Sequence, residues 1–278
     1  MLRFARHWIA GETAESGIER VKHENSLGIL GILNLLGEEI KSNDEVAKTV
    51  NEYKKLLNMI SDAKVKSQIS VKPTQVGLNS DFDYCVSNYL EIAESCMSHD
   101  NNWLWVDMEN APYTEQTIQL YLKVLEKYPN AGIAIQAYMK RSEEDLERLL
   151  PKGAKVRLVK GAYNEPTDVV FRHKDEIKKN FARLTDMLFA QQNFFAIATH
   201  DDYCINHAKD LKKRTPGASF EFEMLLGVRD NLKAQMVSEG YQVREYVPYG
   251  PEWLPYSMRR MREKKSNILL LGRSLFSG

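Results

Sequence analysis

The sequence has few cysteines, no long apolar run and no excess of either charge. Its three cysteines share no C-x-x-C spacing and are odd in number, which excludes a disulfide framework and is typical of reduced thiols. No apolar run approaches the ~18 residues that a membrane-spanning helix needs. The 38 basic residues balance 38 acidic ones, so no overall field attracts nucleic acid. The first residues lack the long apolar segment of a secretory signal, so we expect a cytoplasmic protein without a nucleic-acid partner.

What the sequence does contain is an alternation of short apolar or β-branched runs with longer stretches of helical periodicity. The runs predict strands at 28–36, 68–72, 102–109, 131–138, 154–163, 194–200, 219–225 and 241–247. Between them lie helix candidates such as 42–60, where Ser42, Asn43 and Asp44 are candidate N-caps. The apolar stripe of that helix consists of Val46, Val50, Tyr53 and Leu57.

Eight strand–helix units without a linker or low-complexity break favour one closed barrel over an open sheet. We therefore predict an α/β fold, a (β/α)8 or TIM barrel, as a single domain over 1–278. The "GILG" of the first run has the wrong spacing for the glycine motif of a dinucleotide-binding sheet. Residues 1–27 are expected to form a helical lead-in and 267–278 a C-terminal tail.

In such a barrel the catalytic groups come from the carboxyl ends of the strands, where this sequence places many polar residues. These are Lys72, Asp107, Glu109, Gln136, Tyr138, Arg157, Lys160, Tyr163, Thr199, His200, Asp201, Glu223 and Tyr246, followed on the last helix by Tyr256, Arg259, Arg260 and Glu263. Any one of them alone is an ordinary polar residue of a barrel mouth. Their coincidence at one rim predicts an active site there.

Three chemistries are compatible with this rim. Lys72, at the end of a strand, would form a Schiff base as in barrel aldolases if its amine were neutral. The segment THDDYCINH (199–207) offers two histidines, an aspartate and Cys204 to a metal, but their spacing matches no tight ligand motif, so we expect no metal. In VRLVKGAYNEP, a strand that ends in Lys160 and two small residues favours close approach of a phosphate or pyrophosphate, although Gly161 is equally a plain turn residue.

Several separated motifs also carry a family resemblance. "RLVKGAY", "ATHD", "FEMLLGVR", "YVPYG" and "YSMRRMRE" occur in the order found in the proline dehydrogenases, and the similarity runs from about residue 11 to about residue 263. The sequence therefore resembles that family of FAD enzymes, which have a distorted (β/α)8 barrel and oxidise L-proline to 1-pyrroline-5-carboxylate. Because the motifs are separate and in the correct order, the resemblance is more specific than any one of them.

The resemblance implies roles for individual residues. It implies catalytic roles for Lys72, Asp107 and Arg157. It implies substrate contacts for Lys72, Ala162, Tyr163, Leu225, Tyr246, Tyr256, Arg259 and Arg260. It implies flavin contacts for Met108, Gln136, Arg157, Lys160, Gly161, Ala162, Thr199, His200 and Glu263. It further implies that Asp107 interacts with Lys72, and that Glu38 pairs with an arginine when the site closes.

The physical chemistry of the implied reaction fits these roles. A guanidinium group matches a carboxylate in a bidentate fashion, so Arg259 and Arg260 are expected to clamp the carboxylate of proline. Transfer of hydride from C5 of the substrate to flavin N5 requires mainly positioning by the protein. A cation near N5, here Arg157, would favour the negative charge that arrives on reduction. The side chain of Tyr246 would crowd a 4-hydroxyl group, which favours proline over hydroxyproline.

The resemblance also implies partners. The electrons are expected to pass to a quinone or another acceptor, with transient contact at the inner face of a membrane. A separate pyrroline-5-carboxylate dehydrogenase is expected to consume the product. Three alternatives remain at this point: a Schiff-base lyase or aldolase that uses Lys72, a hydroxyproline-preferring member of the same family, and an inactive barrel whose RRMREKK segment docks a partner.

Overall fold

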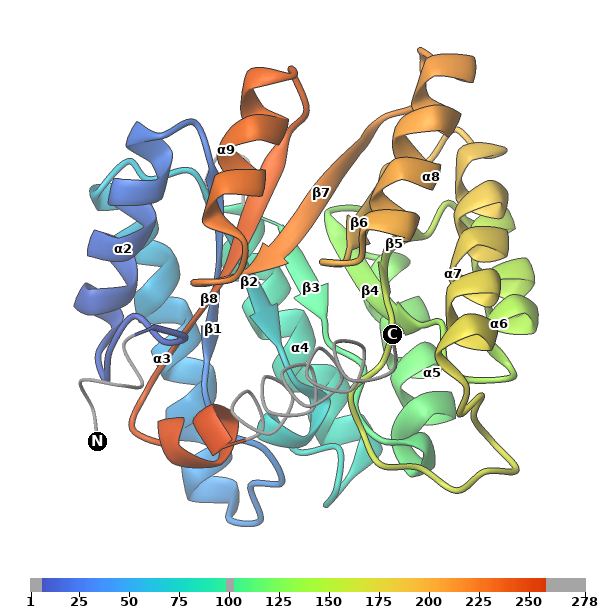
Figure 1. The fold of residues 1–278 in the computed structure, drawn as a ribbon. Coiled ribbons are helices and arrows are strands. Elements are labelled where there is room, and N and C mark those ends of the chain that lie inside the picture. The colour runs from blue at the N-terminus through green and yellow to red at the C-terminus, as the bar shows by residue number, and fades with distance from the viewer. Residues whose placement is uncertain (1–6, 99–102, 259–278) are drawn as a thin grey trace.

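The protein is a closed barrel of eight parallel strands, which confirms the predicted fold (Figure 1). The computed structural model describes residues 7–98 and 103–258. Each strand pairs with the next along the chain, and β1 pairs with β8 to close the barrel. The strands are β1 (Leu30–Leu35), β2 (Ser67–Val71), β3 (Leu104–Val106), β4 (Ala131–Gln136), β5 (Lys155–Val159), β6 (Phe195–Ala198), β7 (Phe220–Leu225) and β8 (Val243–Tyr249).

Helices follow the strands and lie on the outside of the barrel (Figure 1). The α-helices around the barrel are α2 (Ala14–Ser26), α3 (Asn43–Asp62), α4 (Phe82–Met97), α5 (Thr114–Leu125), α6 (Ser142–Leu149), α7 (Lys174–Phe189), α8 (Asp202–Arg214) and α9 (Asp230–Ser238), and residues 253–258 are also helical. Short 3₁₀ helices are η1 (Pro73–Gln75), η2 (Ala111–Tyr113) and η3 (Leu150–Lys152). Because both faces of the sheet are covered, the strands are almost continuously buried.

Helix α3 shows how the sequence pattern becomes an element. It begins after Ser42, whose extended backbone takes the N-cap position, and its first turn carries the acidic residues Asp44 and Glu45. The predicted apolar stripe is buried against the barrel, with Val46 and Tyr53 fully covered. The predicted helix at 42–60 is therefore confirmed with a shift of one or two residues at its ends.

The interior of the barrel is filled by side chains rather than open. Trp105 on β3 points inward, and Gly132 on the neighbouring β4 leaves the space for its ring, since a Cβ at Gly132 would lie 2.3 Å from the indole. The indole Nε1 donates a hydrogen bond to Gln68 Oε1 at 2.6 Å. Ile32 and Ala196 pack against the same ring. This layer fills the barrel interior below the carboxyl ends of the strands, where the active sites of such barrels lie.

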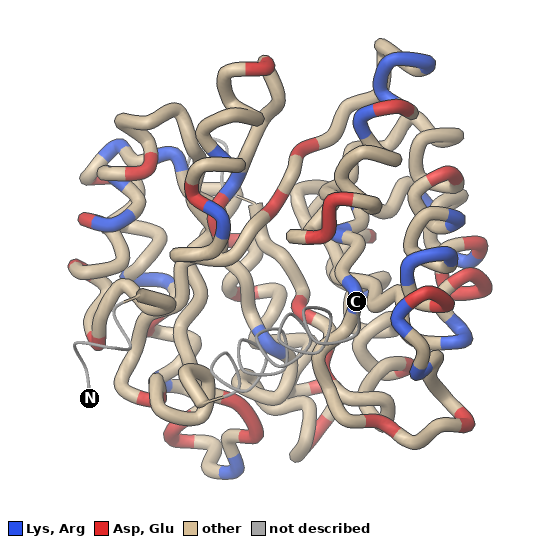
Figure 2. The backbone as a smooth tube through the Cα atoms, viewed as in Figure 1, with Lys and Arg blue, Asp and Glu red and all other residues tan. Residues whose placement is uncertain are grey.

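The outer surface carries charges of both signs. Figure 2 shows Lys and Arg alternating with Asp and Glu along α7, as the neutral composition predicts. Among the helices of residues 7–98 and 103–258, none is long and apolar enough to cross a membrane.

Candidate active site

A cavity of about 400 Å³ lies at the carboxyl ends of the strands and gathers most of the predicted site residues. Those that line it are Lys72, Asp107, Met108, Gln136, Arg157, Lys160, Gly161, Ala162, Tyr163, His200, Leu225, Tyr246 and Tyr256. Glu38 lines an adjacent pocket, which shares Lys72 and Tyr256 with this cavity. The predictions for Arg259, Arg260, Glu263 and the tail at 267–278 lie outside the described residues.

The guanidinium group of Arg157 lies on the floor of the cavity, where only 3% of its side chain is exposed. Its Nη1 donates hydrogen bonds to Asp107 Oδ1 and Ser70 Oγ, both at 2.9 Å. Its Nε lies 2.5 Å from Glu223 Oε2. The guanidinium carbon stacks 4.4 Å above the centroid of the Trp105 ring. A buried cation is thus held between two carboxylates and a flat aromatic floor.

Asp107 connects three strands of the barrel. It follows β3, and its backbone N–H donates to Val71 O of β2 at 2.9 Å. Besides the bond from Arg157, its carboxylate accepts hydrogen bonds from Ser70 Oγ at 2.6 Å and from Tyr246 OH at 2.8 Å. Burial raises the pKa of Tyr246 well above its ordinary value, and the negative charge of Asp107 raises that pKa further. The phenol therefore stays protonated and acts as a donor.

The structure does not show the expected contact between Asp107 and Lys72. Lys72 Nζ lies 3.0 Å from Glu38 Oε2, and Asp107 pairs with Arg157 instead. Lys72 directly follows β2, beyond the inward-facing Ser70, so its amine extends toward the loop between β1 and α3 where Glu38 lies. The expected pairing of Glu38 with an arginine stays a prediction from sequence.

The loop after β5 forms a glycine turn at the rim. The predicted strand to residue 163 ends at Val159, so Lys160, Gly161, Ala162 and Tyr163 belong to the loop. Gly161 has φ +108, and a Cβ there would lie 2.2 Å from the ring of Tyr138. Glycine is therefore required for both the backbone conformation and the close approach to Tyr138.

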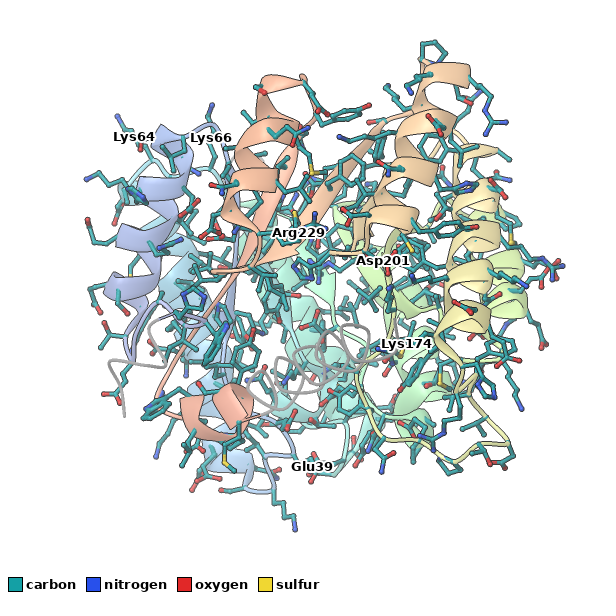
Figure 3. All side chains as sticks on the ribbon, viewed as in Figure 1. Glu39, Lys64, Lys66, Lys174, Asp201 and Arg229 are labelled. Atoms are coloured by element: carbon teal, nitrogen blue, oxygen red, sulfur yellow. The ribbon has the colours of Figure 1, made fainter. Side chains whose placement is uncertain are left out.

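A salt bridge anchors this turn to the start of α8. Lys160 Nζ lies 2.7 Å and Lys178 Nζ 3.3 Å from Asp201 Oδ2. Although burial alone acts to raise the pKa of Asp201, the two ammonium groups lower it below the ordinary value. Arg229, which Figure 3 labels together with Asp201, donates a hydrogen bond from Nη1 to His200 O at 2.7 Å and lies 2.7 Å from Asp202 Oδ1. The loops after β5, β6 and β7 are thus tied together at one rim.

The other predicted flavin contacts are held by local hydrogen bonds. Gln136 Nε2 donates to Glu109 O at 2.7 Å, and Thr199 Oγ1 accepts from Asp201 N at 3.2 Å. His200 Nε2 accepts a hydrogen bond from Leu225 N at 2.9 Å. Thr199 is buried but is not among the residues that line the cavity.

The segment THDDYCINH does not assemble a metal site. Cys204 is buried on α8, and burial raises the pKa of its thiol to about 11. His207 Nε2 contacts Asp186 Oδ1 of α7 at 2.8 Å, on the outside of the barrel. Over the part of the chain that the structure describes, no group of three His, Cys, Asp or Glu residues could hold a metal ion.

Sequence reasoning missed two features of the site. Ser70, which bonds both Asp107 and Arg157, was not singled out, and Glu223 was noted at a strand end without a role. The signal for Ser70 is its position two residues before Lys72, because alternate residues of a strand point to the same face. Glu109, in contrast, was singled out at the rim from the sequence but has a structural role. It accepts hydrogen bonds from Thr74 N and Oγ1 and so holds η1 in place.

These features define a (β/α)8-barrel enzyme whose active site lies at the carboxyl ends of the strands. The family model described as proline dehydrogenase matches residues 17–270. The chain is 34% identical to proline dehydrogenase 1 of Bacillus subtilis subsp. natto, over 95% of this chain and 87% of that protein. It is 31% identical to proline dehydrogenase of Deinococcus radiodurans, over 100% of this chain and 92% of that protein. The chain belongs to the proline dehydrogenase family, as its motifs predict, and is an enzyme of that family.

Solved structures show the same fold. Proline utilization A from Bdellovibrio bacteriovorus, inactivated by N-propargylglycine, matches with a TM-score of 0.84 and 24% identity over 92% of this chain and 32% of that one. The protein of the same name from Corynebacterium freiburgense matches with a TM-score of 0.83 and 21% identity over 95% of this chain and 31% of that one. The chain spans about a third of the length of these structures, so the likeness concerns the barrel.

Proposed function

We propose that this chain oxidises L-proline to 1-pyrroline-5-carboxylate with FAD, by hydride transfer from C5 of the substrate to N5 of the flavin. The observation that carries the proposal is the buried Arg157 on the cavity floor. Its Nη2 is buried and has no hydrogen-bond partner among the described residues, although its other nitrogens contact carboxylates. A buried donor of this kind calls for an acceptor in the cavity.

The residues present fit a flavin. The cavity volume of about 400 Å³ falls in the range of roughly 300–1,000 Å³ that is typical of small-molecule sites. Arg157 would meet the ring system through Nη2, while the Lys160–Gly161–Ala162 turn allows close approach at the rim. When bound, the flavin supplies the two-electron acceptor for the hydride. The protein contributes a fixed positive charge beside it, which is oriented before the reaction begins.

The substrate would lie between the flavin and the side chains of Tyr246, Leu225 and Lys72. Tyr246 is held in one orientation by its hydrogen bond to Asp107, so its ring cannot turn away to make room for a 4-hydroxyl group. This restraint supports a preference for proline over hydroxyproline. The clamp of Arg259 and Arg260 on the substrate carboxylate stays a prediction from sequence.

The fate of the electrons and of the product completes the proposal. We infer that a quinone or another acceptor takes the electrons, with transient contact at a membrane surface in the cytoplasm. A separate pyrroline-5-carboxylate dehydrogenase would consume the product. Both steps follow from the resemblance and the chemistry, because a reduced cofactor must be reoxidised and the imine product is in equilibrium with an aldehyde.

The visible spectrum of the purified protein tests the proposal. We expect flavin absorption that bleaches when L-proline is added without oxygen, and much less bleaching with the same concentration of 4-hydroxy-L-proline. Circular dichroism shows whether the protein is folded. A folded protein that takes up no flavin from added FAD contradicts the proposal, and equal bleaching by both substrates contradicts the assigned preference.

A further inference from the structure

Strand β7 carries two buried carboxylates that point into the barrel, Glu221 and Glu223, each against an arginine. Glu221 and Arg244 form the lower pair, which lies deeper in the barrel. Glu221 Oε1 lies 2.8 Å from Arg244 Nε, and Gln242 also donates to the same carboxylate. Arg244 in turn donates to Gly31 O at 3.1 Å. The lower pair is therefore locked by hydrogen bonds and takes no part in lining the cavity.

The upper pair, Glu223 and Arg157, differs because both residues line the cavity. Only 3% of Glu223 is exposed, its Oε2 contacts Arg157, and its Oε1 has no hydrogen-bond partner among the described residues. Arg157 already pairs with Asp107 on its other side. One cation thus stands between two carboxylates, so the cluster is negative when both are ionised and neutral when one is protonated. The number of protons bound to the two carboxyl groups therefore sets the net charge of the cluster around Arg157.

Of the two carboxyls, Glu223 is the one placed to take up the proton. The carboxylate of Asp107 accepts hydrogen bonds from Ser70, Arg157 and Tyr246, whereas Glu223 Oε1 has no hydrogen-bond partner among the described residues and is free to carry a proton. Burial raises the pKa of Glu223 to about 7, against the opposing effect of Arg157. The charged groups around Glu223 are Arg157 from β5, Glu221 from its own strand and Arg244 from β8, with Asp107, Tyr246 and the imidazole of His200 around the same cavity. Ala198, the residue of β6 that pairs with Glu223, is uncharged.

We propose that Glu223 is a positioning residue for proline oxidation, which sets through Arg157 the positive charge available to the flavin. This inference rests on the proposed function. When Glu223 is ionised it offsets the charge of Arg157 and disfavours the negative charge that arrives with the two electrons. When Glu223 is protonated, that offset is removed and reduction is favoured. The oxidation itself is unchanged, because hydride leaves C5 with both electrons and Glu223 exchanges its proton only with water.

The chain offers a matched pair of variants. Glu223→Gln keeps the size and removes the titration, while Glu221→Gln makes the same change two residues earlier, in the pair that does not line the cavity. The midpoint potential of the flavin in each holoprotein is measured from about pH 6 to about pH 9, which brackets the titration. Above neutral pH we expect Glu223→Gln to shift the reduction equilibrium at least about tenfold toward the reduced form, or about 30 mV for a two-electron couple. The difference should vanish at the acid end. Glu221→Gln should keep the pH dependence of the wild type, displaced toward lower pH because the Glu221 carboxylate helps to raise the pKa of Glu223.

A second measurement does not depend on the flavin. In the infrared spectrum of the apoprotein, a component of the C=O absorption of protonated carboxylic acids should disappear across neutral pH in the wild type, and this component should be missing in Glu223→Gln. Potentials of Glu223→Gln that superpose on those of the wild type, with flavin bound and bleached by L-proline, overturn the role of Glu223 alone. A folded protein that binds no flavin overturns the proposed function together with this role.

Discussion

The glycine turn at the rim gives a prediction whose size follows from the structure. Gly161 has φ +108 and sits on the ring of Tyr138, whereas Gly153 has φ +79 and nothing within 4 Å of a Cβ. Replacing either glycine by alanine forces an L residue into a backbone conformation that costs about 1–2 kcal/mol. At Gly153 no other cost is expected, so Gly153→Ala is the control for the conformation alone.

At Gly161 a steric cost is added. The new Cβ would lie 2.2, 2.4 and 2.6 Å from three atoms of the Tyr138 ring, closer than carbon atoms approach in folded proteins. Tyr138 is only 6% exposed and packs against Met139 and Val170, so the ring cannot move aside freely. Overpacking of a buried site costs about 1–3 kcal/mol. We therefore expect Gly161→Ala to lose about 2–5 kcal/mol of unfolding free energy.

Urea denaturation followed by circular dichroism, with and without saturating FAD, measures both effects. Because the turn lies at the cavity, Gly161→Ala should also bind FAD more weakly, and added FAD should stabilise it less than it stabilises Gly153→Ala. Equal losses of unfolding free energy in the two variants would refute the steric argument. Equal stabilisation by FAD would refute the placement of the turn against the cofactor.

Three further changes probe the cation and the carboxylates. Asp107→Asn weakens the charged hydrogen bonds that orient Arg157 and Tyr246, worth about 1.5–3 kcal/mol, so kcat/KM for proline should fall roughly 10- to 150-fold through lost positioning; an unchanged value in steady-state kinetics contradicts the role of Asp107. Lys72→Met removes a partner of Glu38 and should raise the KM for proline about tenfold while flavin absorption stays, since a part-buried cation that contacts a carboxylate is worth about 1.4 kcal/mol. The pKa of Glu223 is raised from 4.5 to about 7 in the folded protein, so its contribution to stability is complete below pH 4.5 and is lost as the pH rises through about 7. Denaturation at a series of pH values should show a fall of up to about 3 kcal/mol that Glu223→Gln lacks, and parallel curves would contradict the raised pKa.

The fold could be predicted because it depends on local pattern. The eight buried runs and the helices between them have different hydrophobic periods, and their regular alternation favours a closed (β/α)8 barrel. The stripe that contains Val46 and Tyr53 lies at helical spacing and is buried as predicted. The ends of the strands were less accurate: β3 stops at Val106 and β5 at Val159, several residues before the apolar pattern ends. The end of a strand depends on where its neighbour stops pairing, which a single segment does not reveal.

The partners of the site residues depend on the closed barrel and not on local pattern. Asp107 and Lys72 come from neighbouring strands, which makes their contact a natural expectation, yet Arg157 reaches Asp107 from β5. It can do so because the side chains of the intervening β4 are small at this level, with Ala134 paired to Arg157 in the register. An arginine on one wall then spans the barrel interior, and the nearer lysine is left to pair with Glu38. No motif contains this information, since it requires the register of β3, β4 and β5 together.

The same reasoning explains why the sequence assigned no role to Glu223 while it assigned one to Arg157. Alternation within β7 places Glu221 and Glu223 on the inner face, so the sequence indicates two inward carboxylates. Which of them meets a locked arginine and which meets the cavity depends on their depth in the barrel. At the lower level Arg244 is hydrogen-bonded to both Glu221 and Gly31, so the charges are matched and static. At the upper level Arg157 contacts two carboxylates, and its Nη2 has no hydrogen-bond partner among the described residues. A charged group that enters the cavity therefore changes the net charge around Arg157. Function is therefore expected at the level where the buried charges are not yet matched.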